Sequence, residues 1–256
     1  MQLSPAEVWS FGAIGGAAVA LALLERRFPY NPGQKFLRPG FFTDFIWYNG
    51  VQSAVLGFVI GRILHAIDAS TGASRGGLVS AWPVFLQLAF FVVTHDLYIY
   101  AFHRLQHRVP ALWRIHEAHH SVPEVDWLSG VRSHPLEILI NQTIEFAPIV
   151  LLGASPSVPV LKGAVSAIWG MYIHSNLDVR MGAVQRVLNG PEMHRWHHAT
   201  ASEAQGRNFA TKLAVWDWLF GTAYWPAQKA SRYGLGGKDF PEGYFAQVAW
   251  AFRPSS

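Results

Sequence analysis

Apolar residues along this chain gather into long runs that hold almost no charge. A helix needs about 20 apolar residues to cross the hydrocarbon core of a bilayer, and several runs approach that length. The runs are Val8 to Leu24, Phe45 to Gly61 with an extension to Ile67, Gly77 to Thr94, Ile138 to Leu152, and Val158 to Asn176. This pattern predicts an all-α integral membrane protein with four to five transmembrane or membrane-embedded helices.

The residues that flank the runs refine this layout. The first run is preceded by Glu7, and its first positive charges, Arg26 and Arg27, come after it. A secretory signal would carry basic residues before its apolar run, so we expect a retained membrane helix. The last two runs are separated by a Pro/Gly/Ser segment over residues 153–159, which predicts a helical hairpin.

Composition agrees with a membrane location. Hydrophobic residues make up 51% of the chain and charged residues only 14%, whereas soluble domains contain about 25% charged residues. A soluble helical protein with a large core is the alternative, but it leaves the long runs unexplained. The chain has no cysteine, so any metal ion must be bound by His, Asp or Glu, and disulfides give no information on the compartment.

Basic residues predict which side of the membrane each loop occupies. The loop 25–43 contains Arg26, Arg27, Lys35 and Arg38 and is therefore expected in the cytoplasm. After two more crossings the chain returns to the cytoplasmic side near His103, and the predicted hairpin returns to the same side at His174. Residues 178–256 contain no further apolar run, so we expect them to stay on that side. The net charge of +4 follows from this bias and from anionic lipid headgroups, and requires no nucleic acid.

Most of the twelve histidines are clustered on this predicted cytoplasmic side. They form one pair and two similar triplets: His103 and His107; His116, His119 and His120; His194, His197 and His198. Residues three or four apart share one face of a helix, so each cluster can aim several rings at one point. Neutral imidazole binds intermediate metal ions well, and this many nitrogens can hold more than one ion.

Other polar residues near the clusters are candidate members of the same site. His174 ends the fifth run, where an ionisable group beside a membrane is a functional candidate, and Asp178 could pair with it or cap the next turn. Asp96 lies on one helical stripe with His103 and His107 and could accept a hydrogen bond from a ligand ring, or cap a helix end.

Two other functions compete with a multi-metal redox site. The sequence His116-Glu117-Ala-His119-His120 matches the zinc-protease motif formally, which would make Glu117 the general base of a membrane zinc hydrolase. A zincin site uses only three protein ligands, so it leaves the other histidines unexplained. Non-catalytic metal binding or transport is the third possibility.

In these motifs the chain resembles the membrane fatty acid hydroxylase and sterol desaturase superfamily, over about residues 85–225. The three histidine clusters match the family's histidine boxes. Further matches are Arg132-Ser-His134-Pro-Leu-Glu137, His174-Ser-Asn176 and the segment from Trp216 to Thr222. The resemblance implies a cytosolic helical cap over the membrane helices, with two iron ions held by nine histidines, the eight clustered ones and His174. Asp96, His134 and Asn176 are then expected nearby.

The resemblance also implies a reaction and partners. Members use dioxygen and external electrons to oxidise C–H bonds of lipids, which implies hydroxylation or desaturation of a sterol, a fatty acyl chain or another isoprenoid or alkyl lipid. A separate reductase or small electron-transfer protein is then required. At one position the chain departs from the family pattern, because some members have a histidine where this chain has Asp178. We expect membrane helices in 1–80, a catalytic domain in 81–225 and a cytosolic tail in 226–256.

Overall fold

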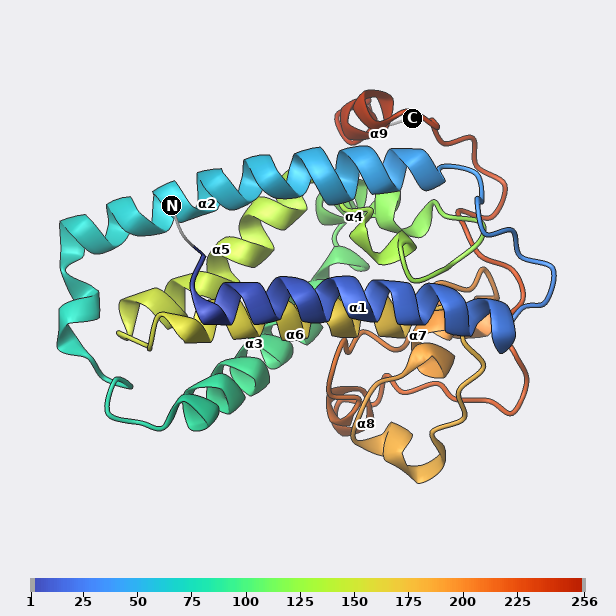
Figure 1. Ribbon diagram of the computed structural model, residues 1–256. Coiled ribbons are helices and arrows are strands. Elements are labelled where there is room, and N and C mark those ends of the chain that lie inside the picture. The colour runs from blue at the N-terminus through green and yellow to red at the C-terminus, as the bar shows by residue number, and fades with distance from the viewer. Residues whose placement is uncertain (1–2, 255–256) are drawn as a thin grey trace.

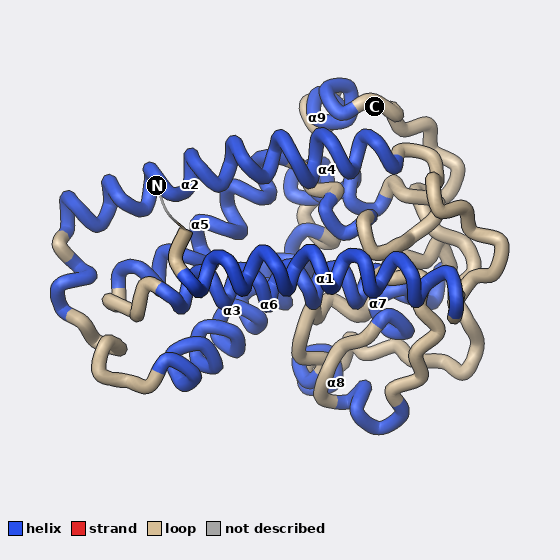
Figure 2. The backbone as a smooth tube through the Cα atoms, viewed as in Figure 1, coloured by secondary structure: helices blue, strands red, loops and turns tan. Residues whose placement is uncertain are grey.

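The structure, a computed structural model, describes residues 3–254, and its regular elements are helical, with two isolated β-bridges in the described part. The long helices are α1 (Pro5–Arg27), α2 (Ser53–Thr71), α3 (Val84–Gln106), α5 (Pro135–Leu151) and α6 (Ser157–His174). The short ones are α4 (Pro110–His120), α7 (Pro191–His197), α8 (Val215–Leu219) and α9 (Tyr244–Trp250). Figures 1 and 2 show both sets, and the all-α prediction is confirmed.

The long helices form the body of the molecule, and the short helices gather in a cap at one end (Figure 1). At the opposite end, the link between α2 and α3 meets the α5–α6 turn, where the Val79 amide donates to the Leu152 carbonyl. Gly153 has φ +69° there, and a Cβ would lie 2.6 Å from the Ser74 carbonyl oxygen. Only glycine fits this close contact.

Helix α1 begins with strong local signals. The Ser4 hydroxyl caps the Glu7 amide while the Glu7 carboxylate accepts from the Ser4 amide, and Pro5 occupies the first turn. The helix packs along α6 but buries few of its own side chains, leaving Trp9 and Phe11 exposed. Exposed apolar side chains on a long helix are suited to contact with lipid tails.

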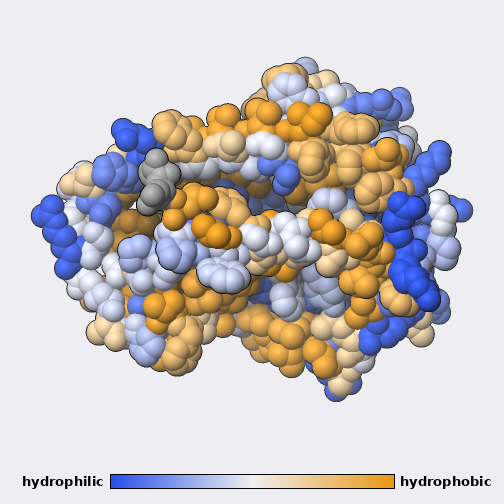
Figure 3. All heavy atoms as spheres, viewed as in Figure 1, coloured by the Kyte–Doolittle hydropathy of each residue, from blue (hydrophilic) through white to orange (hydrophobic). Residues whose placement is uncertain are grey.

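Within residues 3–254, three helices are long and apolar enough to cross a membrane: α1, the continuous helix Thr43–Thr71, and α3. The helices α5 and α6 have 17 and 18 residues and contain the buried charges Glu145 and Lys162. The predicted total of four to five membrane helices therefore stays a prediction. Figure 3 shows apolar surface along the long helices and polar surface at both ends.

Helix boundaries differ from the apolar runs at two places. The third run starts at Gly77, but its helix begins at Val84, because Gly77 has a positive φ and Pro83 takes the N-cap position. Helix α3 then continues to Gln106, beyond the end of the run. His103 is thus helical, and His107 follows as the C-cap residue. The fifth run extends to Asn176, whereas α6 ends at His174.

The arrangement of the helices makes a topology prediction testable. Reporter tags after Arg38, after Arg108, or after Ser256, which lies outside the described residues, are expected to report the cytoplasm, whereas a tag near Ser74 should report the opposite side. The reason is that the basic loops and the cap lie at one end, and the α2–α3 link lies at the other. Tag accessibility in intact and permeabilised cells measures this. A cytoplasmic Ser74 would contradict the layout.

Candidate metal centre

The structure brings the eight clustered histidines and His174 together in two groups. The first group is His103, His107, His116, His120 and His197, and the second is His119, His174, His194 and His198. Within each group, the candidate ligand nitrogens all lie within 4.8 Å of one another. The rings come from α3, α4, α6 and α7 and from the residues that end these helices, so segments far apart in sequence share one site.

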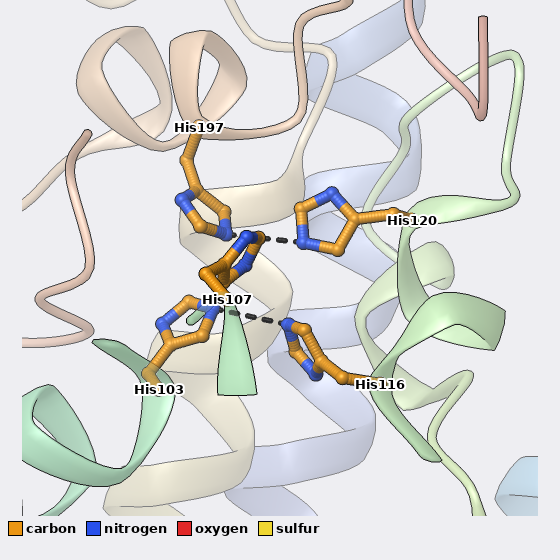
Figure 4. Close-up of side chains that lie close together, drawn as sticks. All are labelled: His103, His107, His116, His120 and His197. Atoms are coloured by element: carbon orange, nitrogen blue, oxygen red, sulfur yellow. Dashed lines mark hydrogen bonds between the residues drawn. The ribbon is translucent and has the colours of Figure 1, made fainter. Parts of the chain in front are cut away.

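Pairs of Nε2 atoms approach each other closely inside each group. In the first, His103 and His116 are 3.1 Å apart, as are His120 and His197 (Figure 4). In the second, the pairs are His174 with His119 at 3.2 Å, His194 with His174 at 3.0 Å, and His198 with His194 at 3.2 Å. Two nitrogen atoms that each lie 2.0–2.1 Å from one metal ion, with a right angle between them at the ion, would be about 3 Å apart.

The hydrogen bond of the other ring nitrogen, Nδ1, determines whether Nε2 carries a proton or a lone pair in these contacts. Five rings have Nδ1 beside a fixed acceptor: His103 at the Phe209 carbonyl (2.8 Å), His197 at the Arg207 carbonyl (2.8 Å), His119 at the Arg132 carbonyl (3.0 Å), His174 at the Gly170 carbonyl (2.8 Å) and His116 at the Glu137 carboxylate (2.8 Å). A carbonyl oxygen only accepts, so Nδ1 carries the proton and Nε2 has a lone pair. Facing lone pairs repel, and a cation between them removes this repulsion.

Burial keeps these rings neutral. Desolvation, followed by the neighbouring rings, holds the pKa of His120, His197 and His198 well below the usual value. Desolvation also lowers the pKa of His119. Neutral imidazole is the form that ligates a metal ion, so the site is ready for ions without first losing protons. The donor set therefore fits two ions of the type that prefer nitrogen ligands.

Two carbonyl acceptors come from one short segment, residues 207–209. Asn208 has φ +55°, a conformation that asparagine tolerates better than most residues, and its side-chain amide donates to the carbonyls of Met193 and Tyr224. The neighbouring carbonyls of Arg207 and Phe209 thereby face His197 and His103. Sequence analysis missed this segment because backbone acceptors have no residue-type signature.

Glu137 is a second residue whose role sequence analysis missed. It lies in the first turn of α5, is 4% exposed, and accepts from His116 Nδ1 at 2.8 Å. A carboxylate on a ligand's other nitrogen fixes the ring and makes the ligand more basic. The available signal was an acidic residue in the first turn of a mostly apolar helix, since such a charge needs a buried partner.

A buried ion pair holds a third acceptor in place. The Arg132 guanidinium donates two hydrogen bonds to Asp44, at 2.7 and 3.0 Å, while the Arg132 carbonyl accepts from His119. Asp44 belongs to η1 (Thr43–Gln52), a π-helical segment that precedes α2. Because bidentate pairs restrict orientation, this contact connects a membrane helix to the ring of His119.

Three expected neighbours of the metal site have other partners. Asp96 was predicted to accept from a ligand ring, but its carboxylate accepts from the Lys212 and Leu213 amides and from the Thr211 and Trp216 side chains. It thus fixes the loop that follows Phe209. His134 caps α5 and contacts the Val248 carbonyl, and Asn176 exchanges hydrogen bonds with the Asn31 backbone.

Neither of the two carboxylates considered for metal chemistry joins a histidine group. Asp178 is exposed at the surface, and its carboxylate contacts Lys229 at 2.7 Å and Arg180 at 3.6 Å. Glu117 is buried, but it accepts from Arg253 at 2.7 Å. Adjacent residues on a helix point in different directions. Because His116 points into the histidine group, Glu117 points toward the C-terminal segment.

Cavities reach the histidines from two sides. One, of about 240 Å³, lies among α3, α5 and α6 and is lined by His103, His116, His119, His174 and His194. Another, of about 220 Å³, lies in the cap beside His107, His120, His197 and His198. The groups are therefore accessible both from the helix bundle and from the cap.

Comparison with known proteins gave consistent matches. A family model described as fatty acid hydroxylase matches residues 88–222. An ornithine lipid hydroxylase of Rhizobium tropici is 34% identical over 172 residues, covering 67% of this chain and 52% of that protein. Human alkylglycerol monooxygenase is 31% identical over 127 residues (50% and 28%), and the Danio rerio protein 32% over 156 residues (61% and 33%).

The matched region thus spans about half of the Rhizobium protein and a third or less of the two monooxygenases. No solved structure matches the chain.

The contact of Glu137 with His116 generates a prediction. Glu137→Gln replaces a charged acceptor by a neutral one, so metal affinity should fall by about 10- to 100-fold. Competition with a chelator of known affinity, using purified protein, measures the change. Glu117→Gln is the matched control, because that glutamate is equally buried but contacts Arg253. Equal affinities for the two variants would show that Glu137 does not support a ligand.

Proposed function

This chain belongs to the fatty acid hydroxylase family, and on that premise we propose that it is a dioxygen-dependent di-iron enzyme that hydroxylates a membrane lipid. The observation that carries the proposal is the convergence of nine buried imidazoles, five of which have Nδ1 fixed by an acceptor. The relatives are an ornithine lipid hydroxylase and alkylglycerol monooxygenases, which supports hydroxylation over desaturation.

The two histidine groups would each hold one iron ion. His103, His107, His116, His120 and His197 would bind the first, and His119, His174, His194 and His198 the second. Five rings would hold the first ion and four the second. Iron with dioxygen supplies the oxidising power to break an unactivated C–H bond, which side-chain acid–base chemistry does not provide.

The protein's own contribution is to position the substrate and exclude water. The cavity among α3, α5 and α6 touches both groups, so a lipid entering from the bilayer can place one carbon beside both ions. Apolar walls such as Ile99, Phe102 and Ile173 keep that carbon dry. The cap-side cavity offers a separate route for small molecules.

Electrons must come from outside this chain in the proposed reaction. Hydroxylation reduces one oxygen atom of dioxygen to water, which takes two electrons and two protons beyond those of the C–H bond. The sequence contains no dinucleotide fingerprint and no haem-attachment motif. We therefore propose a separate reductase or small electron-transfer protein that delivers electrons at the cap.

A zinc hydrolase is the main competing function, and no observation favours it. Its general base would be Glu117, whose carboxylate contacts Arg253 and lies near Lys238. A general base must reach the metal-bound water within hydrogen-bond distance. Glu117 instead links α4 to the C-terminal segment.

Two substitutions separate the oxidative function from hydrolysis. His197→Ala removes one proposed ligand and should abolish oxidation, whereas Glu117→Gln should retain measurable activity. The assay supplies a reductase, reducing equivalents and membrane lipid extract, and mass spectrometry detects a product heavier by one oxygen atom from labelled dioxygen. Glu203→Gln, an exposed carboxylate in the cap, is the control for the charge change.

The opposite pattern would overturn the proposal. Label from water instead of dioxygen, together with an inactive Glu117→Gln and an active His197→Ala, would indicate a hydrolase.

A further inference from the structure

The cavity that reaches the histidines contains charges that metal ligation does not explain. Glu145 on α5 lines it and is 8% exposed. Its Oε1 accepts from Lys162 and from Ser166, both on α6, and lies 3.5 Å from His95 Nδ1 on α3. Lys212, from the loop fixed by Asp96, lines the same cavity and is 7% exposed. We name Glu145, Lys162, His95 and Lys212 the charged subsite.

The charged subsite lies at one level, set back from the histidines. His95 precedes His103 by eight residues of α3, Glu145 follows Glu137 by eight residues of α5, and eight residues correspond to about 12 Å of helix. Between these levels, Ile99 and Phe102 on α3 and Asn141 and Gln142 on α5 line the cavity. A bound molecule would therefore meet apolar and amide side chains near the histidines and charged groups farther along.

A hydrocarbon chain or sterol ring would be a poor occupant of this subsite. Burying a charge against an apolar group removes its water without replacing its hydrogen bonds, which is costly. His95, 9% exposed, lines the cavity, and its Nε2 has no hydrogen-bond partner among the described residues, nor does the Trp169 Nε1. Lys162 Nζ lies 3.1 Å from His95 Nδ1, so Nδ1 accepts and the proton of this ring is on Nε2. Both unpartnered atoms are therefore donors, and they call for a ligand with hydrogen-bond acceptors.

The balance of charge specifies the ligand further. Lys162 faces Glu145, and Lys212 lies 3.9 Å from Asp96, so the two cations and two anions sum to zero. A ligand with one net charge would leave that charge uncompensated in the interior, whereas a zwitterion would not. Glu145 and Lys212 both line the cavity and belong to different pairs, so a zwitterion can contact one with each of its charges.

We propose that the charged subsite binds a zwitterionic headgroup of the lipid substrate, with the headgroup ammonium on Glu145 and its anionic group on Lys212. The proposal rests on the proposed function for the identity of the cavity as the reaction chamber. It places the oxidised carbon within about 12 Å of the headgroup, the eight-residue spacing along α3 and α5. Oxidation far along a long acyl chain is then excluded.

The test measures lipid binding, not turnover. Metal-loaded full-length protein in nanodiscs is titrated without dioxygen or reductant, using lipids with identical tails. The headgroups are one with an ammonium and a carboxylate, its N-acetyl derivative, its carboxyl methyl ester, and a neutral diol. The parent lipid should bind about tenfold more tightly than either blocked derivative, since each block removes one charged hydrogen bond.

Variants assign each charge to its residue. In Glu145→Gln, N-acetylation of the lipid should change the affinity less than about twofold, while esterification should still weaken binding about tenfold. In Lys212→Met, esterification should have the small effect and N-acetylation the tenfold effect. Lys35→Met and Glu203→Gln, both exposed and outside the cavity, should behave as wild type. Metal content and thermal unfolding confirm that each variant is folded, and if Glu145→Gln does not fold, Lys212→Met alone still tests the assignment.

The results also separate this proposal from the proposed function. Equal affinity of all four lipids, or an N-acetylation effect that persists in folded Glu145→Gln, would overturn the charged subsite. A phosphodiester headgroup with an ammonium, tested in parallel, decides whether the anionic group is a carboxylate or a phosphate. The predicted binding pattern in a protein that oxidises no lipid would support the subsite and contradict the oxidative function alone.

Discussion

The arrangement depends on hydrogen bonds that give Nδ1 of each fixed histidine a proton. Four backbone carbonyls and one carboxylate accept these protons. The Nε2 lone pairs of His103 and His116 therefore face each other at 3.1 Å, and those of His119 and His174 at 3.2 Å. Facing lone pairs in a dry interior are unfavourable, and folding must supply the energy to hold them. Metal binding recovers this energy, so the site and the fold are thermodynamically linked.

Segments far apart in the sequence hold the acceptors that fix the histidine rings. The membrane helix containing Asp44 orients Arg132, whose carbonyl faces His119. Asp217 accepts from the Phe209 and Ala210 amides and so holds the segment that faces His103 and His197. Because rings on different helices must meet within a fraction of an ångström, buried carboxylates that fix the backbone matter as much as the rings themselves.

Helices and histidine clusters could be predicted from the sequence because both follow from local spacing. A run of apolar residues indicates a helix whatever surrounds it, and His-x-x-His-His places rings on one face. The backbone acceptors could not be predicted, since Arg207 and Phe209 contribute carbonyl groups, which have no residue-type signature. Asp96 illustrates the limit: its position on the histidine stripe was visible, but its four hydrogen bonds go to the cap loop.

The interior of α5 and α6 shows a second limit of the same kind. As sequence, Glu145 and Lys162 are interruptions in apolar runs, and nothing local reveals that they meet. In the structure they pair across the two helices beside His95, next to the cavity that reaches the histidines. The chemistry of the proposed substrate chamber thus depends on charged residues that are far apart in the sequence, whereas the metal-binding rings follow from local spacing.

Metal analysis combined with X-ray absorption of the purified protein shows whether two ions share these nine imidazoles. Protein isolated in mild detergent from iron-replete cells should contain about two ions per chain, because one tetrahedral zinc would use only about four of the imidazoles. The nearest shell of each ion should be rich in imidazole nitrogen, and a metal–metal signal should be present. A single ion per chain, or a shell dominated by oxygen, would contradict the account.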